Sequence, residues 1–483
     1  MKMKKRYILL LILVIGCLLS YAFFIYEPKQ FTGIDRNGNE YFCERGFIKV
    51  PELRTDPNSR DIKVEYVKIN SSSKNPKTPI FYLAGGPGQG ATGQSENKNS
   101  LSYWSSFLED RDVVLIDQRG IGKINMLYAQ LKWPNDSLFI SESAAQRHIA
   151  GLATKAIKAF ENRGINLNGY NSIENAHDID AIRVSLGYEK IIPFGFSYGT
   201  HLGQSYLKYH EDKVERAILI GVEGLGETFK MPLNLDLQMD KLNKLIQADS
   251  MLAPSIPDFT LLYQKVAKQL SLEPIELEIE TPIKLTRKIK IGKFGLDHIL
   301  RRDMGDARDI PYLPKLLLEM EKGEYESLEF YAQKRYREFL AVPAMTMSMD
   351  LASGGSEERI NRIRSQEKQS MFGNISNFPF LDLHGVWPVE DLGETFRSPP
   401  TSYVPVLLLS GDLDINTPAY QADTLAQYLS NSTHLVVKNS GHEQIMYLWD
   451  AIKTMIAFMN GENVSSVELG YEKIEFKLPK AGR

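Results

Sequence analysis

The chain has 483 residues, of which 43% are hydrophobic and 24% charged, a composition typical of a globular protein that can bury a core. Its formal net charge of −3, with no basic stripe or acidic tail, argues against a nucleic-acid partner. The sequence has two cysteines, Cys17 and Cys43, so the rest of the chain can form neither a disulfide framework nor a thiolate metal site. Because the eight histidines form no His-Glu-x-x-His pattern and no phosphate-binding glycine motif occurs, we expect neither a metal nor a nucleotide cofactor.

Residues 1–27 differ from the rest of the chain, because four basic residues precede an uncharged apolar run at 7–26. Twenty helical residues rise about 30 Å, the thickness of a bilayer's hydrocarbon core. The basic flank predicts a cytoplasmic N-terminus and an extracytoplasmic body, in the periplasm or at the cell surface. Cleavage as a signal peptide after Ala22, or lipidation of Cys17 in a lipobox-like sequence, is an alternative. The apolar run continues past both positions, which favours an uncleaved membrane anchor.

The first part of the body alternates strand and helix patterns. Residues 61–69 alternate charged and apolar side chains, which predicts a half-exposed antiparallel strand. Residues 79–83 and 112–116 are continuous apolar runs, typical of parallel strands covered on both faces. Residues 172–186 carry a helical apolar stripe with Ser172 as a candidate cap.

The alternation continues with a strand at 191–196, a helix at 198–209 and a strand at 217–222. Amphipathic helical patterns then occupy residues 226–400, after which strand patterns resume at 404–409 and 433–437. These patterns predict an α/β fold with a mostly parallel sheet and a helical cap insertion. The expected parts are the membrane segment (1–27), the first part of the core (28–225), the cap (226–400) and the second part of the core (401–483).

A Gly-x-Ser-x-Gly motif centred on Ser197 occurs where a predicted strand ends and a helix begins. This is the position of a nucleophile elbow, in which glycines allow a strained turn between strand and helix. The start of the following helix directs backbone N–H groups towards negative charge that develops beside the serine. Ser197 is therefore a candidate nucleophile, with a plain glycine-rich turn as the alternative.

An oxyanion hole needs a second N–H donor from another loop, and the glycine-rich turn at residues 84–90 can supply it. A serine nucleophile also needs a base and a carboxylate, in the chain order serine, acid, histidine. Asp412 and Asp414 follow one predicted strand, and His442 follows the next. Since the carboxyl ends of parallel strands share one edge of a sheet, these side chains are candidates for the acid and the base.

Together these motifs resemble the α/β-hydrolase serine exopeptidases that include prolyl iminopeptidases and tripeptidyl aminopeptidases, particularly their larger exported branch. The resemblance rests on Gly-Gly-Pro-Gly at 85–88, Asp-Gln-Arg-Gly at 117–120, the serine motif, Gly-Asp-Leu-Asp at 411–414 and Gly-His at 441–442. It implies that the acid is Asp414. Two departures concern the substrate: Ala84 replaces the usual histidine, and no cysteine occurs near Asp350.

The resemblance implies acyl transfer to water without a cofactor, with Ser197, His442 and Asp414 as the triad. The N–H groups of Gly86 and Tyr198 would form the oxyanion hole. An aminopeptidase must also bind the substrate's ammonium group, for which the candidates are two carboxylates, Glu223 and Asp350, with a solvated or helix-capping acid as the alternative for each. The expected partner is a peptide. An esterase acting on small acyl compounds, or a non-catalytic binding protein on the same scaffold, is the alternative.

Overall fold

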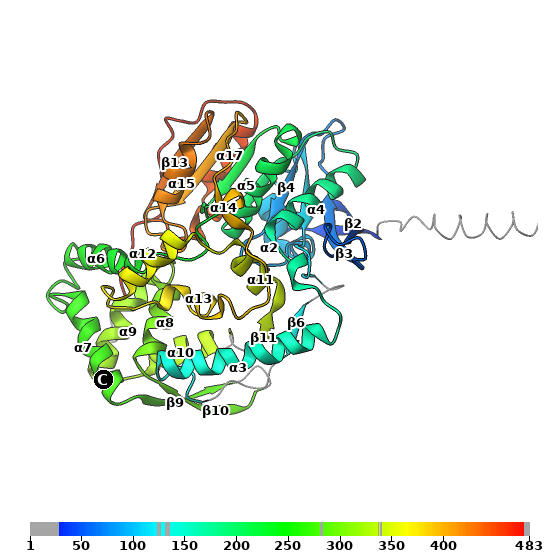
Figure 1. Ribbon diagram of the computed structural model, residues 1–483. Helices are drawn as coiled ribbons and strands as arrows, with labels where there is room; N and C mark the ends of the chain where they lie inside the picture. Colours follow the sequence, from blue (N-terminus) through cyan, green and yellow to red (C-terminus); the bar gives the residue numbers. More distant parts are fainter. Residues whose placement is uncertain are drawn as a thin grey trace, which may run out of the picture.

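The computed structural model describes residues 29–122, 127–130, 136–280, 284–336, 338 and 341–477. A ten-stranded sheet occupies the upper half of the molecule in Figure 1. From one edge to the other its strands are β1 (Lys29–Ile34), β2 (Glu40–Pro51), β3 (Asp61–Ile69), β5 (Arg111–Ile116), β4 (Lys77–Leu83), β7 (Ile192–Phe196), β8 (Ala217–Ile220), β12 (Val406–Gly411), β13 (Ser432–Lys438) and β14 (Leu469–Gly470).

In this order the strands from β5 to β14 run parallel to one another, whereas β1, β2 and β3 form an antiparallel extension that joins β5 through β3. The predicted α/β fold with a mostly parallel sheet is therefore confirmed. The expectation that β3 is half exposed is wrong, because most of this strand is buried. Its Glu65 remains tolerable inside because Arg45 pairs with it at 2.8 Å.

Helices cover both faces of the sheet, and successive strand residues point to opposite faces. Phe81 packs in the core that includes α4 (Ser172–Ser185) and α5 (Tyr198–His210), whereas Ile80 packs with α2 (Lys98–Trp104) and α17 (Trp449–Met459). Two shorter helices, α15 (Ala419–Ala426) and α16 (Gln444–Tyr447), follow β12 and β13.

The cap of helix α4 differs from the prediction. Asn171 caps the helix, because its side-chain oxygen accepts a hydrogen bond from the Glu174 N–H at 2.9 Å. Ser172 lies inside the first turn, and its hydroxyl is 2.9 Å from that of Tyr198. Asparagine and serine are about equally good caps, so the sequence alone could not separate these neighbours.

Between β8 and β12 the chain forms a second body, drawn in the lower half of Figure 1. We call it the cap lobe. Its helices are α6 (Leu233–Gln247), α7 (Phe259–Leu272), α8 (Lys293–Asp303), α9 (Leu313–Glu321), α10 (Glu326–Tyr336), α11 (Ala344–Ser353), α12 (Glu357–Glu367) and α13 (Phe380–Leu383); α14 (Gly393–Arg397) leads back to the sheet.

The sequence predicted a helical cap, but the cap lobe also contains strands. Strands β9 (Ile275–Glu280) and β10 (Thr286–Ile291) form an antiparallel pair, and β11 (Ala341–Pro343) pairs with β6 (Tyr128–Gln130). The long helix α3 (Glu142–Glu161) also lies in this lobe, beside α13 and β11 (Figure 1). Residues expected to belong to the core thus contribute to the cap, because α3 packs against α13 and β11.

In the ranges that the structure describes, no helix is both long and apolar enough to cross a membrane. The predicted anchor at residues 7–26, including Cys17, lies outside those ranges.

Candidate active site

Ser197 occupies the sharp turn between β7 and α5, with a left-handed backbone (φ 55°, ψ −125°) that a non-glycine residue rarely adopts. The flanking glycines are required by space. A Cβ at Gly195 would collide with the carbonyl oxygen of Gly199, and one at Gly199 would collide with that of Leu83. The Ser197 N–H donates to the Ile220 carbonyl at 2.9 Å, which fixes the turn against β8. This is the geometry of a nucleophile elbow.

His442 and Asp414 lie on the loops after β13 and β12, at the same edge of the sheet as Ser197. The His442 Nδ1 atom is 2.7 Å from the Asp414 Oδ2 atom. The second oxygen of Asp414 accepts hydrogen bonds from the N–H groups of Asn416 (2.8 Å) and Thr417 (3.0 Å). The Thr417 hydroxyl donates to Asp414 Oδ2 at 2.6 Å. The carboxylate is therefore held rigidly against the imidazole, while Asp412 accepts a hydrogen bond from the Ser440 N–H at 3.2 Å instead.

Burial and charge act in opposite directions on this pair. Burial favours the neutral imidazole, but the Asp414 carboxylate outweighs it and raises the pKa of His442 above its ordinary value. Burial likewise favours a protonated Asp414, but His442 and the hydrogen bonds of Thr417 lower the pKa of this carboxyl. The arrangement suits an ionised Asp414 that stabilises an imidazolium forming during reaction.

The glycine-rich loop after β4 lies directly against the serine. A Cβ at Gly85 would be 2.9 Å from the Ser197 Cβ atom, so only glycine allows this approach. Gln118, from the Asp-Gln-Arg-Gly motif, fixes the loop by donating to the Ala84 carbonyl at 2.7 Å and accepting from the Gly88 N–H at 3.2 Å. That motif therefore positions the loop that carries Gly86.

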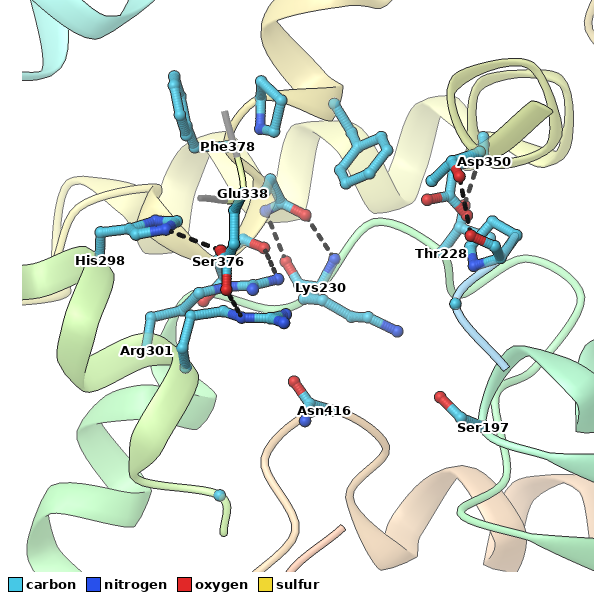
Figure 2. A pocket seen from close by; sticks show the side chains of 18 of the residues that line it. Ser197, Thr228, Lys230, His298, Arg301, Glu338, Asp350, Ser376, Phe378 and Asn416 are labelled. Carbon is cyan, nitrogen blue, oxygen red and sulfur yellow. Dashed lines mark hydrogen bonds and ion pairs between the residues drawn. The ribbon is translucent and has the colours of Figure 1, made fainter. Parts of the chain in front are cut away.

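A cavity of about 750 Å³ lies between the sheet edge and the cap lobe (Figure 2). Its wall includes five of the predicted site residues: Gly86, Ser197, Glu223, Asp350 and His442. The other two lie behind the wall, where Asp414 contacts His442 and Tyr198 begins helix α5 next to Ser197. The described residues contain no group of three or more His, Cys, Asp or Glu placed to bind a metal.

The two candidate ammonium-binding carboxylates are both buried in this wall but lie in different electrostatic surroundings. Glu223 is paired with Lys230, whose ammonium nitrogen is 2.5 Å from the Glu223 Oε1 atom. Burial, together with repulsion from Glu223, raises the pKa of Asp350 well above its usual range. The two carboxylates thus form a site whose negative charge increases when Asp350 ionises.

Sequence reasoning missed the basic residues that the cap lobe contributes to the cavity. Its wall includes Lys230, Arg301, Arg302, Arg308, Lys334 and Arg335. Arg301 and Arg302 sit in the last turn of α8, where basic residues commonly complement a helix dipole. Their sequence pattern therefore carried no sign of a cavity.

A second Ser–His–Asp chain exists away from this cavity. His434 lies 3.0 Å from the Ser410 hydroxyl and 2.8 Å from an Asp423 carboxylate oxygen. Ser410 is completely buried inside β12, and none of the three residues lines the active-site cavity. The hydrogen-bonded chain alone is thus not sufficient for a site, because substrate cannot reach this serine.

A family model described as the alpha/beta hydrolase fold matches residues 78–447 of the chain. The chain belongs to this family. The match extends from β4 to the helix that follows His442, and so includes the elbow, the cap lobe and the loops that carry Asp414 and His442.

Relatives of this chain include the tripeptidyl aminopeptidases of Streptomyces lividans and Streptomyces coelicolor. Each is 28% identical over 186 residues, or 37% of this chain. The matched stretch spans only 35% and 34% of the relatives' own lengths. The chain is also similar to a proline iminopeptidase-related protein from Thermus thermophilus, with 14% identity and a TM-score of 0.38 over 86% of this chain and 98% of that one. The family model and the two tripeptidyl aminopeptidase relatives together confirm the resemblance to a peptidase-like α/β-hydrolase family.

Proposed function

We propose that the protein is a serine hydrolase in which Ser197 attacks a carbonyl carbon while His442 takes the hydroxyl proton. Asp414 keeps the proton of the imidazole on Nδ1, so that Nε2 is the base. The N–H groups of Gly86 and Tyr198 stabilise the oxyanion, and water then releases the acyl group. The observation that carries this proposal is the 2.7 Å contact between His442 and Asp414 at the edge where Ser197 enters the cavity.

The substrate we propose is a peptide with a free amino end, from which the enzyme releases N-terminal residues or a short peptide. Buried carboxylates in the cavity support this proposal, since an ammonium group is the natural partner of a desolvated carboxylate. Similarity to two tripeptidyl aminopeptidases supports it as well. Asp350 is the better ammonium anchor, because Glu223 already has Lys230 as its cation.

We expect Asp350→Asn to lower kcat/KM for free-amino peptide coumarylamides by about 10–100-fold, the usual worth of a charge-assisted hydrogen bond. A neutral p-nitrophenyl ester should be hydrolysed almost as before, because it never uses the ammonium subsite. Glu223→Gln should also weaken peptide hydrolysis. Kinetics on both substrates check this prediction.

The matched control is Asp382→Asn, since Asp382 is an exposed cap-lobe carboxylate that hydrogen-bonds Gln146 outside the cavity. It should behave like wild type. Equal losses on peptide and ester would refute the role of Asp350, and efficient cleavage of long N-blocked peptides would refute the exopeptidase itself.

An esterase or other small-acyl hydrolase is the second candidate, and one observation favours it. Lys230 partly neutralises the carboxylate pair, which weakens attraction for an ammonium group. If the neutral ester is a far better substrate than every free-amino peptide, and blocking the amine makes no difference, the esterase is correct.

We also propose that the catalytic part lies outside the cytoplasm and is held to the membrane by residues 7–26. The full-length protein should sediment with membranes and be accessible to protease in spheroplasts. A chain lacking residues 2–27 should be soluble. Cys17→Ser should still sediment if the apolar segment is the anchor, but not if a lipid on Cys17 is. Full-length protein found soluble in the cytoplasm would contradict the proposal.

A further inference from the structure

Basic side chains gather at the end of the cavity that the cap lobe closes. They come from two neighbouring helices, α8 with Arg301 and Arg302, and α10 with Lys334 and Arg335. The cavity therefore has a different electrostatic character here from that beside Asp350.

Most of these cations are matched by carboxylates. Arg335 binds Asp303 through two nitrogens, and its third nitrogen is 2.7 Å from Glu338. Lys334 lies 2.9 Å from Asp303 and from Asp309. In the same way, Arg302 lies 3.4 Å from Glu338. These ion pairs hold Arg302, Lys334 and Arg335 rigidly and neutralise most of their charge, so little net charge remains to attract a ligand.

Arg301 is the exception. Its guanidinium donates a hydrogen bond to the Ser376 carbonyl oxygen at 3.0 Å, and in the described part of the chain no ion pair joins it to a carboxylate. Burial and the neighbouring Arg302 lower the pKa of Arg301 to about 9, so it still carries its charge at neutral pH. A partly desolvated guanidinium with one neutral partner has unused donors and an uncompensated charge.

Arg301 and the reacting serine face the same cavity from opposite walls. In Figure 2 Arg301 lies on the far side from Ser197 and Asp350, with the Lys230 side chain between them. A ligand that reaches from Asp350 past Ser197 towards Arg301 would meet a carboxylate at one end and a cation at the other.

We propose that Arg301 binds a carboxylate of the substrate, so that the enzyme prefers short peptides carrying both a free amino group and a carboxylate within reach of the cap lobe. This rests on the proposed peptidase function. The planar fork of a guanidinium binds a carboxylate through two parallel hydrogen bonds, which gives orientation as well as affinity. The carboxylate is either the C-terminus of a short peptide or an acidic side chain, since both present the same group.

The test compares three free-amino peptides of equal length: one with a free C-terminus, its C-terminal amide, and an amide with glutamate in place of a neutral residue. We expect wild type to hydrolyse at least one of the two carboxylate-bearing peptides with a kcat/KM about 10–100-fold above that of the neutral amide. Arg301→Gln should remove this preference and leave the neutral amide unchanged. Whichever peptide loses more shows whether the carboxylate is terminal or from a side chain.

Arg362→Gln is the matched control, because Arg362 is an exposed arginine of α12 that does not line the cavity. Arg301→Lys should keep only part of the preference, since lysine has the charge without the fork. Circular-dichroism melting checks that Arg301→Gln is folded. The inference is overturned if wild type shows no preference for a carboxylate, or if Arg301→Gln affects neutral and carboxylate-bearing peptides equally.

Failure of the peptidase proposal can be separated from failure of the Arg301 proposal. If no free-amino peptide is hydrolysed, the same variants are assayed on p-nitrophenyl butyrate and on the p-nitrophenyl half-ester of a dicarboxylic acid. Loss by Arg301→Gln on the half-ester alone supports carboxylate binding in an esterase. Equal rates on both esters, or equal losses, reject it.

Discussion

Replacing Ser197 by alanine should lower kcat/KM by about 10⁴–10⁶-fold, because the nucleophile and its base act as one unit whose loss leaves only binding and the oxyanion hole. The melting temperature should hardly change, since alanine occupies the same turn and the hydroxyl is not needed to hold it. Intact-mass detection of a fluorophosphonate adduct gives the same answer independently, because the probe needs an activated serine.

The chain provides a matched control for this variant. Ser410 also lies within hydrogen-bond distance of a histidine that contacts an aspartate, but it is completely buried. Ser410→Ala should therefore keep both turnover and labelling, apart from a modest loss of stability. Labelling that persists in Ser197→Ala would show that another residue is the nucleophile.

Replacing Asp414 by asparagine should lower kcat by about 10⁴-fold, the size of loss seen when the orienting carboxylate of a serine protease is removed. Asparagine presents an amide that no longer fixes the proton on Nδ1 of His442. Asp412→Asn should be mild, because its remaining oxygen can still accept from the Ser440 N–H. Steady-state kinetics on any accepted ester or peptide compare the two variants, and a larger loss in Asp412→Asn would reassign the acid.

The same variants have different pH profiles. His442 works as a base only when it is neutral, so kcat/KM should fall as the pH drops through the His442 pKa, which Asp414 raises above its ordinary value. Asp414→Asn removes the carboxylate that raises the pKa of His442. Burial, which favours the neutral imidazole and lowers this pKa, remains. The acid limb of this variant should therefore move to lower pH. An acid limb unchanged in Asp414→Asn would mean that another group controls it.

The order of the motifs along the chain and the positions of the glycines made it possible to predict that Ser197, Asp414 and His442 lie at one edge of the sheet. The elbow needs glycine on both sides of Ser197 because backbone atoms lie where side chains would be, and such a requirement is visible in a sequence. The roles proposed for Ser197, Asp414 and His442 remain predictions, although the structure brings Asp414 and His442 into contact.

The cap lobe was harder to predict, for two reasons. The β9–β10 hairpin did carry a signal, since Glu and Lys alternate with apolar residues on its two strands, but the surrounding helical patterns obscured it. The positive charge of the cavity wall left no signal in the sequence. Whether Arg301 faces a ligand or solvent depends on how α8 packs against α10, which is a matter of tertiary structure and not of local pattern.

The pairing of β6 with β11 affects the order in which the parts of the protein can fold during synthesis. Helix α3 follows β6 and takes its place in the cap lobe, yet its partners in β11 and α13 are synthesised much later, after the elbow and most of the cap helices. Such a distant contact is slow to close, because the chain between must first be brought together. His442, the proposed base, is made later still, after β13. A nascent chain thus carries Ser197 well before Asp414 and His442 have been made, so the proposed triad can assemble only after residue 442 has been synthesised.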